Sequence, residues 1–248
     1  MKIKGKVVLI TGANGGIGTA LVNELLTRGA EKIYAAVRSN PSDCKFEKDV
    51  DGKVVPIKLD ITNAEDVKSA ADQCKDVDIL INNAGINRLM WLTGPSGMEA
   101  ARNEMEVNFF GTLAVSQAFA PILASRGGGA MVIVSSIIGI ISMPANSTYC
   151  CSKAAAHSMT QGLRGELSAQ GTLVAGVYPG PVETPMTDGQ EMPKAKPEQV
   201  ADAILTGLEN GQEDIFPDPM SQDVYAQFTK DPKQAEKELG AIVPPQEV

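Results

Sequence analysis

Short, nearly continuous aliphatic runs alternate with longer stretches of helical spacing, and this alternation limits the possible fold more than any other feature. Aliphatic runs of strand length occupy residues 6–11, 33–37, 54–59, 77–82, 130–135 and 173–178, with a shorter one at 214–217. Helical spacing covers residues 15–28, 64–74, 99–123, 147–169 and 197–209. Strands that are apolar on both sides are typical of a parallel sheet covered by helices on both faces. The sequence therefore predicts an α/β fold in which residues 1–248 form a single domain around a doubly wound parallel sheet.

Composition argues against several classes of protein. The 248 residues are 43% hydrophobic, which suits one large α/β domain. The net charge of −8 comes with no basic cluster, so we expect no nucleic-acid partner. We find no window with the roughly 20 apolar residues of a membrane span, and expect no membrane partner. One histidine and four cysteines without metal-ligand spacing predict no metal site and fit a cytoplasmic protein.

A glycine-rich turn joins the first predicted strand to the first predicted helix. It reads TGANGGIG and spans Thr11 to Gly18. Residues without a Cβ let the backbone approach a pyrophosphate, and the helix N-terminus offers free N–H groups and a positive dipole end. A tight strand-to-helix turn would need only one or two glycines. The turn therefore predicts phosphate binding, and the absence of a G-K-[ST] sequence excludes a P-loop.

The end of the second predicted strand indicates which dinucleotide is bound. An acid at this position holds the ribose 2′-OH of NAD, whereas an arginine accommodates the 2′-phosphate of NADP. The strand ends in Val37-Arg38-Ser39. We therefore predict a preference for NADP over NAD. Asp43 is the alternative ribose ligand if the strand ends later than expected.

Tyr149 and Lys153 lie four residues apart in a predicted helix and so share one face of it. A free tyrosine has a pKa near ~10 and is a poor proton donor at neutral pH. A nearby cation stabilises the phenolate and lowers that pKa. A surface pair of no function is the alternative. The glycine turn, together with Ser136 at the end of another strand, favours a catalytic pair.

These features together resemble the short-chain dehydrogenase/reductase family over nearly the whole chain. The resemblance rests on six stretches in the expected order: TGANGGIG (11–18), LDIT (59–62), NNAG (82–85), NFFG (108–111), the Ser136, Tyr149 and Lys153 set, and PGPVET (179–184). It implies a Rossmann-like fold and an oxidoreductase of the NADP-preferring carbonyl reductase type. The basic residue that some NADP-using members carry in the glycine turn is replaced here by Gly15.

The resemblance also implies a role for each matching residue. The catalytic residues would be Tyr149 as proton donor, Ser136 and Lys153 as its partners, and Asn108 holding a water in a proton relay. Asp60 would contact the adenine amino group, and Asn82 would support the fourth strand. Val182 and Thr184 would meet the nicotinamide carboxamide. The full set of expected NADP(H)-binding residues is Gly12, Asn14, Gly15, Gly16, Ile17, Gly18, Arg38, Ser39, Asp60, Ile61, Asn83, Ala84, Gly85, Tyr149, Lys153, Pro179, Gly180, Val182 and Thr184.

The substrate side is expected to be apolar, as in most small-molecule sites. The candidates for its wall are Leu89, Met90, Trp91, Ile137, Ile138, Met143, Met186 and Met192. Residues 185–212 are predicted to carry a substrate lid, centred on the polar stretch 187–196. The charged tail 231–248 is either a loosely attached arm or a contact with another subunit. The family resemblance implies a homo-oligomer, a dimer or a tetramer.

The predicted function is hydride transfer between NADP(H) and a small or medium apolar ketone or aldehyde, or the corresponding alcohol. Two alternatives keep the fold and change the substrate or cofactor: a 3-oxoacyl-thioester reductase, and an NAD-dependent alcohol or polyol dehydrogenase. A third alternative is a non-catalytic NADP(H)-sensing protein. The complete set of Ser136, Tyr149, Lys153 and Asn108 argues against it, because a sensor needs no proton donor.

Overall fold

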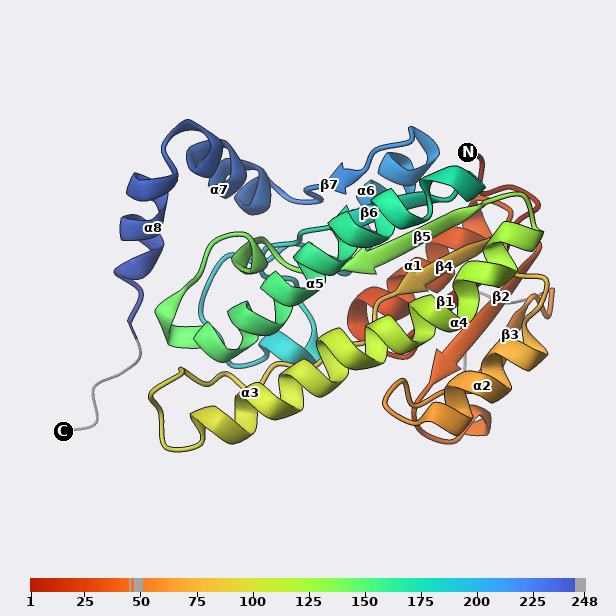
Figure 1. The fold of residues 1–248 in the computed structure, drawn as a ribbon, viewed down its shortest axis with the longest axis horizontal. Coiled ribbons are helices and arrows are strands. Elements are labelled where there is room, and N and C mark those ends of the chain that lie inside the picture. Colours follow the sequence, from red (N-terminus) through yellow and green to blue (C-terminus); the bar gives the residue numbers. More distant parts are fainter. Residues whose placement is uncertain (45, 47–50, 244–248) are drawn as a thin grey trace.

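Seven parallel strands form the single sheet of the structure, a computed structural model that describes residues 1–44, 46 and 51–243 (Figure 1). The strands follow the order β3-β2-β1-β4-β5-β6-β7 across the sheet. Their bounds are β1 Val7–Thr11, β2 Lys32–Val37, β3 Val54–Lys58, β4 Ile79–Asn82, β5 Ala130–Val134, β6 Leu173–Val177 and β7 Asp214–Ile215. The chain winds outward from β1 in one direction and then from β4 in the other. The predicted doubly wound, Rossmann-like single domain is confirmed.

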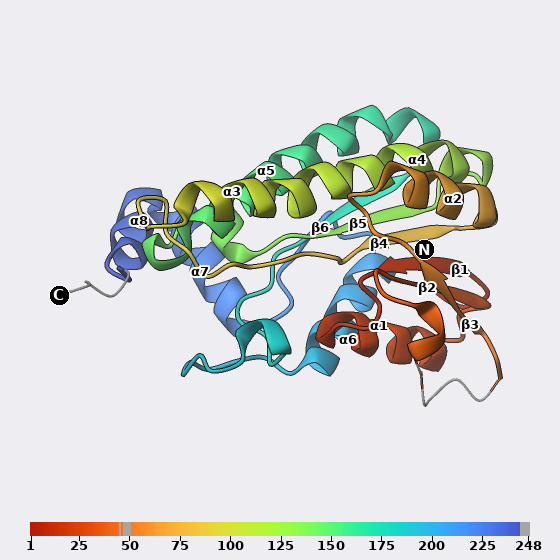
Figure 2. The same cartoon turned by 90° about the horizontal axis from the view of Figure 1, so that it is seen from below.

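Helices cover both faces of this sheet (Figure 2). One face carries α1 (Gly16–Thr27) and α6 (Pro197–Glu209). The other carries α2 (Ala64–Gln73), α4 (Thr112–Ser125) and α5 (Ser147–Glu166). Helix α3 (Gly97–Met105) runs into α4 through a π-helical stretch, Glu106–Gly111. Helices α7 (Pro219–Lys230) and α8 (Pro232–Gly240) lie beyond the carboxyl ends of the strands.

The alternation of side chains along β1 explains why its whole sequence is apolar. Val8 and Ile10 belong to the core under α1 and α6, whereas Val7 and Leu9 belong to the core under α2, α4 and α5. Successive side chains of a strand point to opposite faces of the sheet. A strand buried between two helical layers therefore needs apolar residues at every position.

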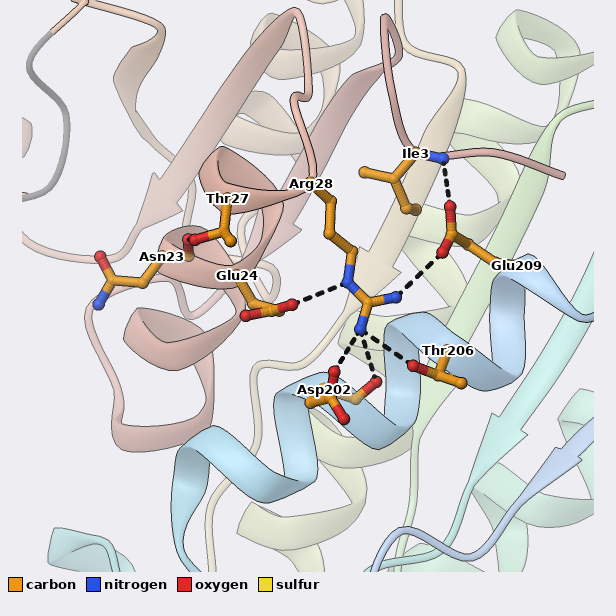
Figure 3. A network of polar contacts seen from close by, with 8 residues as sticks. All are labelled: Ile3, Asn23, Glu24, Thr27, Arg28, Asp202, Thr206 and Glu209. Carbon is orange, nitrogen blue, oxygen red and sulfur yellow. Dashed lines mark hydrogen bonds and ion pairs between the residues drawn. The ribbon is translucent and has the colours of Figure 1, made fainter.

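Arg28, at the C-terminus of α1, ties this helix to α6 (Figure 3). Its guanidinium forms ion pairs with Glu24, Asp202 and Glu209 at 2.8, 2.5 and 3.1 Å. Glu209 also accepts a hydrogen bond from the backbone N–H of Ile3 at 3.1 Å. The same carboxylate thus fastens the start of the chain and the α1–α6 pair together.

Two predictions about chain segments need correction. Helix α6 belongs to the core, with Val200, Ile204 and Leu205 fully buried, so the lid proposal is confined to residues 185–196. The tail is not a loose arm as far as it is described: Asp231 caps α8, whose Ala235 and Leu239 pack near Ile141. The tail residues 244–248 lie outside the described residues.

The expectation that no stretch is apolar enough to span a membrane was wrong by length and composition. The continuous helix 97–125 is long and apolar enough to cross a membrane, with a hydropathy of 1.4 in its most apolar stretch. It packs within the fold, against α2 and α5. Beside the sheet, Asp78 is buried and accepts hydrogen bonds from the Val7 backbone and from Arg126.

Candidate functional site

Tyr149 and Lys153 project from the first turns of α5 and are both buried, with 8% and 4% of their surface exposed. The Lys153 Nζ lies 5.6 Å from the centre of the Tyr149 ring and donates a hydrogen bond to the Val134 carbonyl at 2.9 Å. Burial lowers the pKa of Lys153 to about 8. Burial also raises the pKa of Tyr149, and smaller contributions in the same direction come from Cys150 and Glu104. The lowering of the Tyr149 pKa expected from Lys153 is therefore not found in this arrangement.

Asn108 lies in the π-helical stretch, and its side chain forms three hydrogen bonds. Its Oδ1 accepts from the N–H of Ile86 at 2.8 Å, and its Nδ2 donates to the carbonyl of Ile86 at 2.9 Å and to Ser152 Oγ at 2.9 Å. A Cβ built on Gly85 would stand 3.0 Å from Asn108 Oδ1 and 3.4 Å from Lys153 Nζ. The structure therefore brings Asn108 and Lys153 together around Gly85. π-helical turns of this kind often occur at functional sites.

The two serines after β5 have different partners. Ser135 Oγ donates to the backbone carbonyl of Lys153 at 3.0 Å and so anchors α5 to the strand. Ser136 Oγ donates to the Pro179 carbonyl at 3.2 Å, beyond the carboxyl end of the sheet. The backbone conformation of Ser136 is extended, and it starts the short turn Ile137–Gly139, whose Gly139 packs against the backbone of Lys153. This placement leaves Ser136, rather than Ser135, as the candidate site serine.

The glycine turn forms a cradle that side chains would fill. Gly12 has a φ of +65°, and a Cβ there would stand 3.0 Å from the Cα of Ala84. A Cβ on Gly16 would stand 2.8 Å from the Cβ of Thr184, and one on Gly18 would meet the turn backbone 2.9 Å away at the Cα of Ala13. Gly15 is the N-cap of α1, and because glycine has no side chain it cannot cap the first backbone N–H groups of the helix. Asn14 and Gly15 are exposed, and Ile17 is half-buried.

Asn83 and Ala84 are fastened to this turn. Asn83 Nδ2 donates to the carbonyls of Thr11 and Gly12 at 3.0 and 3.1 Å. Thr11 Oγ1 accepts from the backbone N–H groups of Asn83 and Ala84, each at 3.0 Å. Thr11 was not among the predicted site residues. Its position at the end of β1, facing the end of the neighbouring β4, is the signal that indicates such a role.

The Pro179–Thr184 loop closes the site from the side of β6. The carbonyl of Pro179 accepts from Ile137 N–H at 3.0 Å, and Gly180 N–H donates to Asp218 Oδ2 at 2.8 Å. The side chain of Val182 belongs to the core, so only its backbone remains for a ligand. Thr184 Oγ1 donates to the Val182 carbonyl at 3.3 Å.

The residues expected around the adenosine lie at the ends of β2 and β3. Arg38 and Ser39 are exposed, and within the described residues Arg38 forms no hydrogen bond or ion pair. Asp60 Oδ1 accepts from the N–H and Oγ1 of Thr62 at 3.0 and 2.7 Å. The Ile61 side chain packs against Gly111, so its contact with a cofactor would use the backbone. The side chain of Asp43 lies outside the described part of the chain.

The apolar candidates for the substrate wall do not form one group. Leu89 is 46% exposed. Ile138 and Met143 pack with Val224 and Phe228 of α7, next to α8. The remaining candidates are half-exposed Met186 and Met192, partly buried Met90 and Trp91, and buried Ile137. Helices α7 and α8 thus cover part of the wall that the sequence assigned to the loop after β5.

Four polar groups at the site escaped the sequence analysis: Thr11, Glu104, Ser152 and Asp218. Asp218 is buried and caps α7 through the Ser221 N–H while it holds Gly180. Ser152 accepts from Asn108. Glu104 and Asp218 belong to no motif, and tertiary packing alone gives them their partners. Within the described residues, no group of three or more His, Cys, Asp or Glu side chains is placed to hold a metal ion.

Comparison with known proteins decides the family. The family profile described as short chain dehydrogenase matches residues 6–194. The chain belongs to the short-chain dehydrogenase family. This short-chain dehydrogenase is therefore an oxidoreductase by family, as its sequence predicted.

Relatives and solved structures cover nearly all of this short-chain dehydrogenase. An uncharacterized oxidoreductase of Staphylococcus epidermidis is 32% identical, with 84% of this chain and 92% of the relative covered. A 3-oxoacyl-acyl-carrier-protein reductase of Thermotoga maritima is 33% identical, covering 83% and 91%. A short chain dehydrogenase from Burkholderia cenocepacia, solved in complex with NADP, is 41% identical, with a TM-score of 0.91 and 96% and 99% covered.

Proposed function

We propose that this short-chain dehydrogenase is an NADP(H)-dependent carbonyl reductase, or in reverse an alcohol dehydrogenase, acting on small or medium apolar ketones and aldehydes. The observation that carries the proposal is the buried Tyr149–Lys153 pair beside Gly85 and Asn108. Ligands of open α/β sheets bind outside the carboxyl ends of the strands, where this pair lies.

The residues present fit a dinucleotide. Gly12 and Gly16 leave room that any side chain would fill, at the uncapped N-terminus of α1 where a pyrophosphate binds well. Arg38 is exposed, without a partner among the described residues, at the end of β2. An arginine at this position suits the 2′-phosphate of NADP. The NADP complex of the Burkholderia structure supports the same cofactor.

We assign the remaining predicted cofactor residues as the family resemblance implies. Bound NADPH supplies the hydride. The backbone of the glycine turn, from Gly12 and Asn14 to Gly18, would hold the pyrophosphate, with Arg38 and Ser39 at the 2′-phosphate. Asp60 and Ile61 would border the adenine. Residues 83–85 would lie along the cofactor, and residues 179–184 would border its nicotinamide end.

The proton chemistry would belong to the chain's own side chains. Tyr149 Oη would donate a proton to the carbonyl oxygen of the substrate, and Ser136 Oγ would hydrogen-bond the same oxygen. Burial raises the pKa of Tyr149, so efficient proton donation near neutral pH would need that pKa to be lowered again. Lys153 would bind ribose hydroxyls and, while charged, favour loss of the tyrosine proton. Asn108 Nδ2 donates a hydrogen bond to the Ile86 carbonyl. The same carbonyl would accept a hydrogen bond from the water of the proton relay.

A second candidate, reduction of a 3-oxoacyl thioester, is favoured by the name of the Thermotoga relative. The same four residues would serve both reactions. The two differ in the part of the substrate beyond the carbonyl. Residues 185–196, which we propose as the lid, and helices α7 and α8 would contact that part.

We also propose a homo-oligomer, a dimer or a tetramer, and a cytoplasmic setting. Met98 and Phe110, on the long helix 97–125, are 70% and 51% exposed, which supports an apolar contact between subunits. All four cysteines are free thiols, in keeping with a reducing compartment.

The test is cofactor depletion with a panel of apolar ketones, aldehydes and one acetoacetyl thioester, with NADPH and NADH in parallel. Turnover of ketones or aldehydes with NADPH supports the proposal. Turnover of the thioester alone selects the second candidate. Faster turnover with NADH removes the proposed role of Arg38 and keeps the proton chemistry. Tight NADPH binding without any turnover would favour a sensing protein.

A further inference from the structure

The segment between β4 and α3, residues 86–92, is held at every second residue by a buried polar side chain. Asn108 binds both the N–H and the carbonyl of Ile86. Further along, the partners are Glu104 Oε1 for Arg88 N–H at 2.6 Å, Thr148 Oγ1 for the Met90 carbonyl at 2.9 Å, and Ser147 Oγ for Leu92 N–H at 3.0 Å. We call residues 86–92 the strap.

The strap connects the two helices that carry the candidate catalytic residues. Glu104 and Asn108 lie four residues apart and so on one face of the α3 helix and its π-helical continuation. Thr148 directly precedes Tyr149 in α5. A displacement of the strap would therefore move Asn108 relative to Tyr149.

The backbone is strained in the middle of the strap, at Leu89, whose N–H donates a hydrogen bond to Asn87 Oδ1 at 2.8 Å. Leu89 has a φ of +52°, and it is the one non-glycine residue with positive φ within the described ranges. A leucine adopts this conformation at a cost, and only when its surroundings impose it. The hydrogen bonds that Glu104 and Thr148 form with the strap, at Arg88 and Met90, lie on either side of this residue.

Among the buried side chains that hold the strap, Glu104 is the one with an ionisable carboxyl, and it has no role in the proposed chemistry. It is 0% exposed, and its Oε2 has no hydrogen-bond partner among the described residues. Burial raises the pKa of its carboxyl. A glutamate is almost never fully buried without a complete set of partners. Thr148, which donates its hydroxyl proton to the Met90 carbonyl, acts on the Glu104 carboxyl from α5, so Glu104 lies beside the helix of Tyr149.

The charged and titratable groups around Glu104 come from two neighbouring elements. Arg88, in the strap, is a cation that acts on the Glu104 carboxyl. Besides burial, Cys150 and Glu104 both raise the pKa of Tyr149, in α5. The Nζ of Lys153 lies over the Tyr149 ring. An ionised Glu104 opposes ionisation of Tyr149, whereas a charged Lys153 favours it.

We propose that Glu104 is a positioning residue for the reaction: its carboxyl holds the strap at Arg88 and thereby fixes Asn108 relative to Tyr149. The proposal rests on the proposed reductase function. It assigns Glu104 a second, smaller effect: in addition to burial and Cys150, its negative charge opposes ionisation of the Tyr149 phenol. Hydrogen bonding to the strap needs only an acceptor oxygen, whereas the effect on Tyr149 needs the negative charge. The two effects are therefore separable by substitution.

The test compares Glu104→Ala with Glu104→Gln, and uses Glu99→Gln, an exposed glutamate of the same helix, as the control. Hydrogen exchange of the strap is measured on the protein without substrate. Reductase kcat/KM and the Kd of NADPH are measured on the same samples. Glu104→Ala is expected to speed exchange in the strap and to lower kcat/KM at least tenfold, with the Kd of NADPH unchanged. Glu104→Gln keeps an acceptor oxygen and is expected to restore both within threefold.

The charge effect has its own readout. In the direction of alcohol oxidation, Tyr149 must lose its proton, so kcat/KM rises with pH through the pKa of this group. Glu104→Gln is expected to move that rise to lower pH, while Glu99→Gln leaves it in place. Wild-type exchange and wild-type kcat/KM in Glu104→Ala would overturn the proposal. So would a Glu104→Gln protein as impaired as Glu104→Ala, or one whose pH profile does not move.

Failure of the reductase function is distinguishable from failure of this proposal. Absence of turnover in the wild-type protein would contradict the reductase. The exchange measurement needs no turnover and still decides whether Glu104 holds the strap. If Glu104→Ala does not fold, Glu104→Gln is compared instead with Thr148→Val, which removes the hydrogen bond to the Met90 carbonyl. Faster exchange in Thr148→Val but not in Glu104→Gln is the expected result, and faster exchange in both overturns the proposal.

Discussion

The side chain of Thr184 lies directly against the backbone of Gly16, although the two belong to loops far apart in the sequence. A Cβ built on Gly16 would stand 2.8 Å from the Cβ of Thr184. The glycine turn and the Pro179–Thr184 loop therefore fit together only if residue 16 has no side chain. Their contact fixes the distance between the proposed pyrophosphate site and the proposed nicotinamide site.

Gly16→Ala is expected to push Thr184 away and to weaken NADPH binding about 10-fold or more, since both loops would hold the cofactor. Calorimetric titration with NADPH measures this loss. Gly165→Ala is the matched control, because a Cβ on Gly165 in α5 meets nothing within 4 Å. That control should bind normally and gain about 0.5–1 kcal/mol in free energy of unfolding. Unchanged NADPH affinity in Gly16→Ala would contradict the placement of the cofactor.

Arg38→Ala is expected to weaken NADPH binding about 10- to 100-fold and to leave NADH binding unchanged. A charge-assisted contact with the 2′-phosphate is present only in NADPH, and its loss accounts for a change of this size. Titration of both cofactors into both proteins gives the ratio. Lys68→Ala removes an exposed cation of α2 and should change neither affinity. An equal loss for both cofactors would argue against a 2′-phosphate contact.

The buried ammonium of Lys153 predicts a rise of stability with pH. Its pKa is about 8 in the folded protein, against an unfolded value of 10.5. Below pH 8 both states are protonated, and between the two values only the unfolded state holds the proton. The wild type should therefore gain up to about 3 kcal/mol over Lys153→Met between those pH values, and nothing further above them. Urea unfolding of both proteins at about pH 7 and about pH 10 measures the difference. Parallel pH dependences would show that Lys153 is not buried as a cation.

Arg28→Ala is expected to lower the free energy of unfolding by about 1–3 kcal/mol, because Glu24 and Glu209 lose a partly buried partner. Asp202 is 65% exposed, so its ion pair contributes little. Denaturant unfolding measures the loss. Kinetic constants at 25 °C should stay unchanged, since the network (Figure 3) is built on the C-terminus of α1, whereas the glycine turn precedes its N-terminus. A change in KM for NADPH would show that the α1–α6 contact reaches the cofactor site.

The sequence predicted the sheet and the main helices because their apolar patterns are local. Residues 6–11 contain β1, and residues 197–209 coincide with α6. The tail was harder, since its charges are typical of a loose arm. Ala235 and Leu239, four residues apart after the cap at Asp231, are the signal for α8 that was overlooked.

The site could be predicted only as far as motifs reach. Ser136, Tyr149, Lys153 and Asn108 were identified from spacing and family resemblance, and their roles stay predictions. The burial of Glu104 could not be foreseen, because the surrounding stretch NEMEV is as polar as a surface helix. The burial of Tyr149, which raises its pKa, likewise depends on tertiary packing.

The most direct test of the proton chemistry is the kcat of Tyr149→Phe with NADPH and the best ketone of the panel, alongside the Kd of NADPH. Phenylalanine keeps the ring and removes the proton donor. We predict a loss of at least about 100-fold in kcat with NADPH affinity unchanged. A kcat within about twofold of the wild type would contradict the assignment of Tyr149 as the acid.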